Sequence, residues 1–139
     1  MSRARILTLV AMVVVTGLGY GAKCYRGPAD GWVNNFGPAS VAYEMLFMLL
    51  FFFVSPRKRS ILPIAATVCI LTCALEFAQL WHPAWLDALR ATFLGRALLG
   101  HQFSWWDLPA YPIGCLAGWF LLRWICQTTD CPSRSSSSI

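Results

Sequence analysis

Charged side chains are scarce in this chain. Only 12% of its 139 residues are Asp, Glu, Lys or Arg, whereas 58% are hydrophobic. A soluble globular domain carries about 25% charged and about 45–50% apolar residues. The polar side chains are therefore too few to cover a water-soluble surface, and we expect one small domain that lies in a lipid bilayer.

The sequence also lacks the common motifs of catalysis, redox chemistry and metal binding. Its six cysteines form no C-x-x-C pair, and no glycine-rich phosphate loop or nucleophile elbow is present. His82, His101 and Asp107 match no metal-ligand spacing. The net charge of +5 comes without the basic face and polar readers of a nucleic-acid-binding protein. We therefore predict no cofactor, no metal and no nucleic-acid partner.

Four long apolar runs are present, at residues 6–22, 41–54, 62–80 and 108–126. A spanning helix needs roughly 20 apolar residues, so the second run spans only if its helix begins near residues 37–39. A re-entrant or tilted helix is the alternative there. A signal peptide is the alternative for the first run, which is longer than the usual apolar segment of about 7–15 residues. The sequence predicts an all-α integral membrane bundle of four transmembrane helices.

This bundle makes up a single domain, residues 1–126. The remaining residues, 127–139, are polar and serine-rich, a composition typical of a disordered tail.

Basic residues indicate how the helices are oriented. The shorter segments on one side of the predicted bundle contain Arg3, Arg5, Arg57, Lys58, Arg59, Arg123 and Arg134. The longer segments on the other side contain Lys23, Arg26, Arg90 and Arg96 together with acidic residues. Because basic residues favour the cytoplasmic side of short loops, we expect both termini in the cytoplasm.

Three acidic residues fall at a similar depth near the non-cytoplasmic face. Glu44 follows the entry of the second predicted helix, Glu76 precedes the exit of the third, and Asp107 stands at the start of the fourth. Thr72, Glu76 and Gln79 have the i, i+4, i+7 spacing of one helical stripe. A polar stripe on an apolar helix should face other helices, so we expect the acids to converge.

The connector before the fourth helix offers basic partners for these acids. Residues 85–99 have apolar residues at helical spacing, with Arg90 and Arg96 between them. We predict a short amphipathic helix at the membrane interface, ended near Gly95 or Gly100. It would hold both arginines within reach of Glu76 and Asp107.

The start of the fourth helix carries capping and packing signals. In "SWWD" either Ser104 caps the helix with Asp107 bonding back, or Asp107 is itself the cap. Asp107 and Tyr111 continue into a stripe with Gly114 and Gly118, and "GCLAG" is a small-x-x-x-small motif that favours close helix packing.

The stretch "EFAQLWHPAWLDALRATFLGRALLGHQFSWWDLPAYPIGCLAGW" resembles the core of a bacterial membrane-protein family, domain-of-unknown-function family 2809. The resemblance is close over residues 75–119 and extends to residues 32–54 through "WVNNFG" and "YE". Other members carry Gly-Asp before the second span, where this chain has Gly37-Pro38-Ala39-Ser40. The family has no established activity. A remote likeness to VanZ-like proteins implies a role in the bacterial envelope, and the family resemblance implies an inner-membrane location.

The leading hypothesis is a non-catalytic envelope component that binds a lipid head group or a partner helix at the polar cluster. The alternatives are a membrane enzyme for a lipid-linked polar substrate, transport by an oligomer, and charges that only tie the interfacial helix to the bundle. The candidate ligand-binding or structural residues are Glu44, Glu76, Gln79, Arg90, Arg96, Ser104, Asp107 and Tyr111, with Gly114 and Gly118 in helix packing.

Overall fold

A computed structural model describes residues 1–35, 37–99 and 105–131, and this part of the chain is helical without a β-strand. The prediction of an all-α fold is therefore confirmed. The helices are α1 (Arg3–Cys24), α2 (Asp30–Asn35), α3 (Gly37–Val54), a single 3-10 turn η1 (Lys58–Ser60), α4 (Ile61–Ala78), α5 (Ala84–Ala91), α6 (Phe93–Leu99) and α7 (Asp107–Thr129).

Three helical stretches are long and apolar enough to cross a membrane: α1, α2 with α3, and η1 with α4. They are compatible with the predicted membrane protein. Helix α7 has 23 residues and is long enough, but it is not among the three helical stretches that are also apolar enough. Asp107, Arg123 and two prolines lie within it and make it less apolar.

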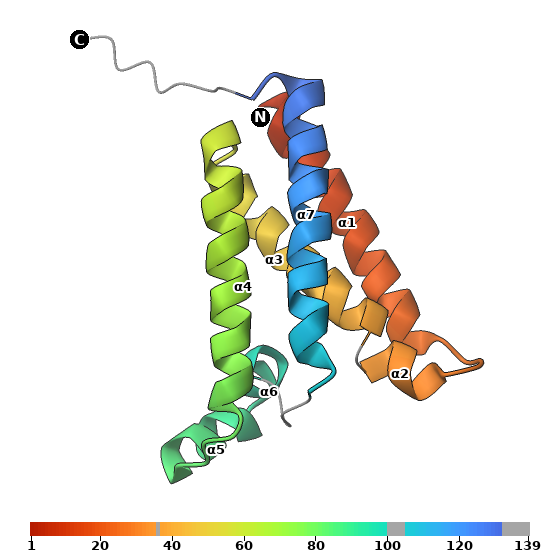
Figure 1. Cartoon of the computed structure of the whole chain (residues 1–139), viewed down its shortest axis with the longest axis vertical. Helices are drawn as coiled ribbons and strands as arrows, with labels where there is room; N and C mark the ends of the chain where they lie inside the picture. Colours follow the sequence, from red (N-terminus) through yellow and green to blue (C-terminus); the bar gives the residue numbers. More distant parts are fainter. Residues whose placement is uncertain (36, 100–104, 132–139) are drawn as a thin grey trace.

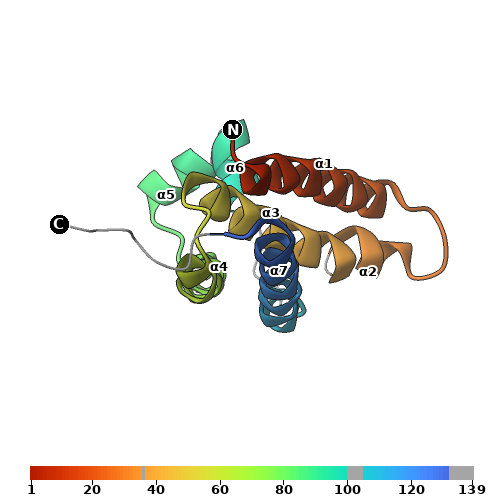
Figure 2. The same cartoon turned by 90° about the horizontal axis from the view of Figure 1, so that it is seen from above.

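Helices α4 and α7 run along the long axis of the molecule, whereas α1 and α3 are inclined to it (Figure 1). One end of the molecule contains the start of α1, the turn η1 and the end of α7. We call it the basic end because Arg3, Arg5 and Arg57–Arg59 are located there. Helices α2, α5 and α6 and the start of α7 lie at the opposite end, which we call the α2 end. Seen from above, α3 is central (Figure 2), and it contacts α1, α4 and α7.

The apolar core lies between α3 and α7. Met48, Leu49 and Phe52 of α3 and Leu122 and Ile125 of α7 are completely buried. The outward faces of the long helices are apolar as well, and large side chains there are mostly exposed, among them Val13, Leu62, Ile70 and Phe120. An apolar outside around an apolar core is the pattern expected when lipid replaces water as the solvent.

The connector before α7 forms two helices instead of the single predicted helix over residues 85–99. Thr92 separates them because its backbone is extended, with φ −73° and ψ 154°. Its hydroxyl donates to the Leu89 carbonyl oxygen (2.6 Å) and accepts from the Gly95 backbone N–H (3.0 Å). Thr92 thus ends α5 and caps α6 with one side chain.

The sequence predicts a helix end near Gly95 or Gly100, but Gly95 lies inside α6. A side chain there would collide with the Leu89 carbonyl group, so the tight passage from α5 to α6 requires glycine. Gly100 lies outside the described residues.

Two further segments are helical where the sequence predicts no helix. The segment before α3 contains the short helix α2, and Ala29 precedes it with a positive φ of 58°. At the other end of the chain, α7 continues to Thr129, three residues beyond the predicted end of the domain. Most of the predicted tail, from residue 132 on, lies outside the described residues.

Candidate functional site

Glu44 is completely buried at the contact between α3 and α7. The Cys115 thiol lies 3.5 Å from its Oε2 as a weak donor, and Oε1 has no hydrogen-bond partner within the described part of the chain. Space for Glu44 exists because residue 114 is glycine. A Cβ atom at Gly114 would lie 2.6 Å from the Glu44 Cβ. The Thr72 side chain also interacts with the carboxyl group, so Glu44 is packed tightly against α7 with neutral side chains as its polar neighbours.

Glu76 lies near the end of α4 and is 1% exposed. The Tyr111 hydroxyl of α7 donates to its Oε2 over 2.7 Å, and the Gln79 amide donates to the same oxygen over 3.3 Å. The Oε1 atom of Gln79 is buried without a hydrogen-bond partner among the described residues. The predicted stripe on α4 thus faces α7.

Asp107, the first residue of α7, joins α7 to α3. The Ser40 hydroxyl donates to its Oδ1 over 2.7 Å. The helix has Trp106 as its N-cap residue, with no side-chain capping bond, so Asp107 bonds across to α3 instead of capping its own helix. Its position in the first turn still suits a negative charge at a helix N-terminus.

Tyr111 lies within electrostatic range of three acids from three different helices. Its hydroxyl bonds Glu76, whereas Asp107 bonds Ser40 and Glu44 has the Cys115 thiol beside it. We call the seven residues Ser40, Glu44, Glu76, Gln79, Asp107, Tyr111 and Cys115 the acidic cluster. Asp107 and Tyr111 are partly exposed, whereas Glu44 and Glu76 are buried. The cluster therefore has an accessible side and a deep side.

Arg90 makes different contacts from those predicted. Its guanidinium donates to the backbone oxygens of Ala78 (2.8 Å) and Trp81 (2.9 Å) and to Asp87 Oδ1 (3.2 Å). Within the described part of the chain its contacts do not include Glu76 or Asp107. Arg90 is 6% exposed and satisfies carbonyl groups at the end of α4, as basic side chains often do there.

Asp87 and His82 complete the contacts of α5. The His82 Nδ1 and Asp87 Oδ1 atoms are 3.1 Å apart. This hydrogen bond, followed by that from Arg90, lowers the pKa of Asp87. The group links α5 to the end of α4 by polar contacts.

The remaining predicted residues lie in different surroundings. Arg96 is exposed on α6, and Ser104 lies outside the described residues. Gly114 and Gly118 face α3, where a Cβ atom at Gly118 would lie 2.6 Å from the Met48 sulfur. In the chain as described, no group of three His, Cys, Asp or Glu side chains is placed to hold a metal ion.

Sequence reasoning missed three residues of this region. Ser40 precedes Glu44 by one helical turn, and that i, i+4 spacing was an available signal. Cys115 follows Gly114 of the predicted stripe directly, and this position was the available signal. Lys23, at the end of α1, interacts electrostatically with Asp107, and nothing in the sequence pattern pointed to that approach.

A comparison with known protein families shows which family this chain belongs to. A family described as "Protein of unknown function (DUF2809)" matches residues 29–115, which is more than half of the 139 residues. The chain belongs to the DUF2809 family. The resemblance seen in the sequence is thereby confirmed, and the matched region contains every residue of the acidic cluster. No solved structure matches this DUF2809 protein.

Proposed function

We propose that this DUF2809 protein crosses the bacterial inner membrane four times, with α7 as the fourth span and both termini in the cytoplasm. At 1.5 Å per residue, α7 is about 34 Å long, which exceeds the roughly 30 Å of the hydrocarbon core. The arginines and lysine near η1 lie at the same end as the start of α1 and the end of α7, and the positive-inside rule assigns that end to the cytoplasm.

In this arrangement α5 and α6 lie in the outer interface. Leu86 and Arg90 of α5 face inward, whereas Phe93 and Leu94 of α6 are 86% and 69% exposed. Trp85 of α5 is exposed, as are Trp81 before this helix and Trp105 and Trp106 before α7. Tryptophan favours the depth of lipid head groups, so the accessible side of the acidic cluster lies at that depth.

The function that the geometry supports best is binding of a lipid head group by a non-catalytic envelope component. The observation that carries this proposal is the partly exposed Asp107, whose Oδ1 accepts from the Ser40 hydroxyl, while the buried Arg90 contacts the end of α4 and not Asp107 within the described residues. Carboxylates removed from water are stabilised by a cation or a proton. The accessible group is Asp107, and a primary ammonium group on the lipid is its complement.

Retention of lipid tests this proposal. The purified full-length protein is exchanged into vesicles that contain equal amounts of phosphatidylethanolamine and phosphatidylglycerol, and the bound lipid is measured by native mass spectrometry. We expect preferential retention of phosphatidylethanolamine. Asp107→Asn should reduce that preference about tenfold, which corresponds to about 1.4 kcal/mol.

The matched control is Asp30→Asn, which removes an exposed carboxylate in α2 whose side chain bonds only the neighbouring Gly31 N–H among the described residues. It should leave the preference unchanged. Equal retention of the two lipids by the wild-type protein would contradict the proposal. Conversion of a lipid that is lost in Asp107→Asn would favour the competing function, a membrane enzyme.

Labelling of cysteines tests the orientation. Cys24 is exposed at the α2 end, whereas Cys126 and Cys131 are buried near the basic end. A membrane-impermeant maleimide should label intact spheroplasts, and Cys24→Ser should abolish the signal. Labelling of Cys24 only after lysis would show the opposite orientation.

A further inference from the structure

Polar side chains recur at three successive turns of α7, where this helix packs against α3 and α4. Asp107, Tyr111 and Cys115 have i, i+4, i+8 spacing, so about 6 Å of helix separates each from the next. Each has a polar partner on a neighbouring helix, in the outer pair Ser40–Asp107 (2.7 Å), the middle pair Glu76–Tyr111 (2.7 Å) and the inner pair Glu44–Cys115 (3.5 Å). The three pairs lead from the α2 end into the bundle over about 12 Å of helix.

The two ends of this series differ in exposure. Asp107 of the outer pair is partly exposed, whereas Glu44 of the inner pair is completely buried. Towards the basic end the three helices continue with the buried apolar residues Met48 of α3, Val68 of α4 and Leu122 of α7. Among the described residues, polar side chains thus connect Glu44 with the α2 end, and apolar side chains separate it from the basic end.

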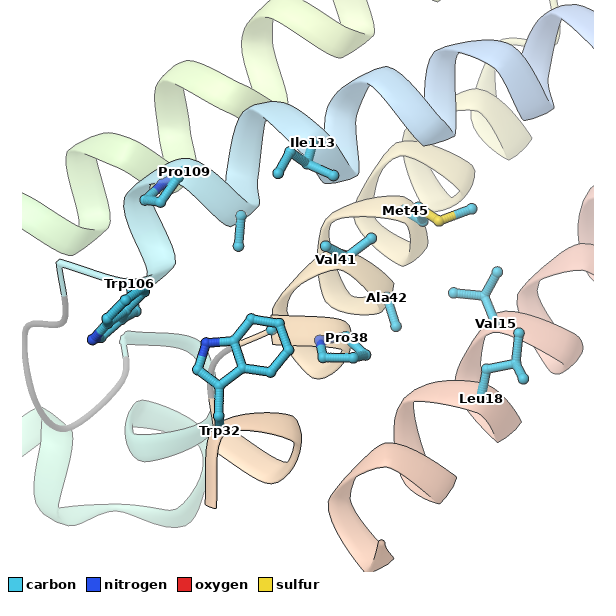
Figure 3. Close-up of a pocket in the computed structure, with 12 residues that line it drawn as sticks. Val15, Leu18, Trp32, Pro38, Val41, Ala42, Met45, Trp106, Pro109 and Ile113 are labelled. Atoms are coloured by element: carbon cyan, nitrogen blue, oxygen red, sulfur yellow. The ribbon is translucent and has the colours of Figure 1, made fainter. Parts of the chain in front are cut away.

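The groove between α1, α3 and α7 offers no second polar route to Glu44 (Figure 3). Val15, Met45 and Ile113 line it, and none of the described residues in its lining is titratable. Tyr43, the neighbour of Glu44 in the sequence, lines a separate pocket together with Lys23 of α1. The route to Glu44 therefore follows the contacts of α7 with α3 and α4.

The Glu44 carboxyl group has one oxygen available for a ligand. Its Oε1 atom is buried without a hydrogen-bond partner among the described residues. The side chains that interact with this carboxyl group within the described part of the chain are neutral ones, namely Tyr43, Thr72, Cys73, Tyr111 and Cys115. A carboxyl group that leaves water without a neighbouring cation is neutralised by a proton, whereas a hard metal ion needs several oxygen ligands. A proton is therefore the ligand that fits Glu44.

We propose that Glu44 is a proton-binding site inside the bundle and exchanges its proton with the α2 end by way of Glu76 and Asp107. In each transfer the O–H bond of the Glu76 carboxyl group breaks as one forms at Glu44 Oε1, and the Glu76 carboxylate then takes the next proton from Asp107. Steps of about 6 Å exceed one hydrogen bond, so a water molecule or the rotation of a carboxyl group bridges each of them. The protonation of Glu44 then follows the pH at the α2 end, which the proposed orientation places outside the cytoplasm.

Gln79 suits Glu76 to both protonation states. Its Nε2 donates to Glu76 Oε2 over 3.3 Å, whereas its Oε1 is buried without a hydrogen-bond partner among the described residues. Because an amide has a donor and an acceptor side, a half-turn of this group presents Oε1 to the protonated Glu76 carboxyl group. The Tyr111 hydroxyl bonds the same Glu76 oxygen from α7, so Tyr111 is a positioning residue.

Infrared spectroscopy tests the site, because a protonated carboxyl group has a carbonyl stretching band that a carboxylate lacks. The full-length protein is measured in dodecyl maltoside, a detergent without a carbonyl group. We expect the band at neutral pH in the wild type and in Asp30→Asn, which removes an exposed carboxylate of α2. Glu44→Gln should lose it. A band of unchanged intensity in Glu44→Gln would overturn the assignment of the proton to Glu44.

Transfer to D2O tests the route, because the band moves to lower frequency as deuterium replaces the proton. Tyr111→Phe removes the hydroxyl group that positions Glu76 and should slow this shift about tenfold. The matched control is Tyr43→Phe, which removes the hydroxyl group of a residue next to Glu44 that lines the pocket at α1. It should exchange at the wild-type rate.

Glu76→Gln is a second test of the same route, because it removes the group that carries the proton. It should slow the shift of the Glu44 band about tenfold or more, as expected for the loss of a proton-transfer group. Unchanged elution on size exclusion confirms that a variant is folded. Exchange in Tyr111→Phe and Glu76→Gln that is as fast as in Tyr43→Phe would overturn the route. Both variants keep Asp107, so the lipid preference of the protein is a separate measurement.

Discussion

Arg90 and Glu44 are both buried and both ionisable, yet their surroundings differ. Arg90 donates to two backbone oxygens and to Asp87, and its Nε is buried without a hydrogen-bond partner among the described residues. Glu44 has the Cys115 thiol at 3.5 Å and a side-chain interaction with Thr72, and its Oε1 has no hydrogen-bond partner among the described residues. The buried arginine is thus held by backbone carbonyl groups and a carboxylate, whereas the buried glutamate has neutral side chains as neighbours.

The largest effect is expected when Arg90 is removed. Arg90→Met keeps the apolar stem but leaves the carbonyl groups of Ala78 and Trp81 without this donor. Loss of partners for buried polar groups costs about 1–3 kcal/mol, and we expect about 2–3 kcal/mol of lost stability in thermal unfolding in detergent. Arg96→Met, at an exposed position, should change stability by less than about 0.5 kcal/mol. Similar losses for the two variants would show that the contacts of Arg90 are unimportant.

A methyl group added beside Glu44 should have the next largest effect. Gly114→Ala brings a Cβ atom to 2.6 Å from the Glu44 Cβ, closer than folded proteins tolerate without a shift of the helices. Overpacking of this kind costs about 1–3 kcal/mol. Gly17→Ala is the control, since no atom lies within 4 Å of its added Cβ, and it should stabilise α1 by about 0.5–1 kcal/mol. The two melting temperatures should therefore move in opposite directions.

Neutralising Glu44 should have a small effect on folding. Glu44→Gln preserves the size of the side chain and removes the cost of burying a charge, so we expect a stability within about 1 kcal/mol of the wild type. The measurement is thermal unfolding in detergent, with Glu44→Leu as the comparison that removes polarity. A loss of about 3 kcal/mol or more for Gln would mean that the carboxylate is paired with a bound cation.

The smallest effect is expected from pH. The hydrogen bond from His82 and then that from Arg90 lower the pKa of Asp87, whose ordinary value is 3.8. A group whose pKa is lower in the folded state stabilises the fold above the ordinary value, and this contribution disappears as the pH falls below it. Protection of the α5 amides in hydrogen exchange should thus decrease below about pH 3.8, and less so in Asp87→Asn. Equal decreases in both proteins would contradict the linkage.

The apolar runs predicted the positions of the long helices because hydrophobic segments of that length have few other solutions in lipid. The similar depth of Glu44, Glu76 and Asp107 along antiparallel helices is consistent with their lying within electrostatic range of Tyr111, although each acid has a different hydrogen-bond partner. The partners of Arg90 did not, because matching opposite charges ignores the backbone carbonyl groups at the end of a helix. The break at Thr92 depends on one hydroxyl that bonds in two directions, and periodicity does not detect such a local contact.

The missing side chain at Gly114 has a mechanical consequence. Glu44 and Met48 sit against Gly114 and Gly118, respectively, so α3 and α7 interlock and cannot slide past each other by a turn. We therefore expect the α3–α7 contact to resist displacement more than the contacts of α1 or α4 do.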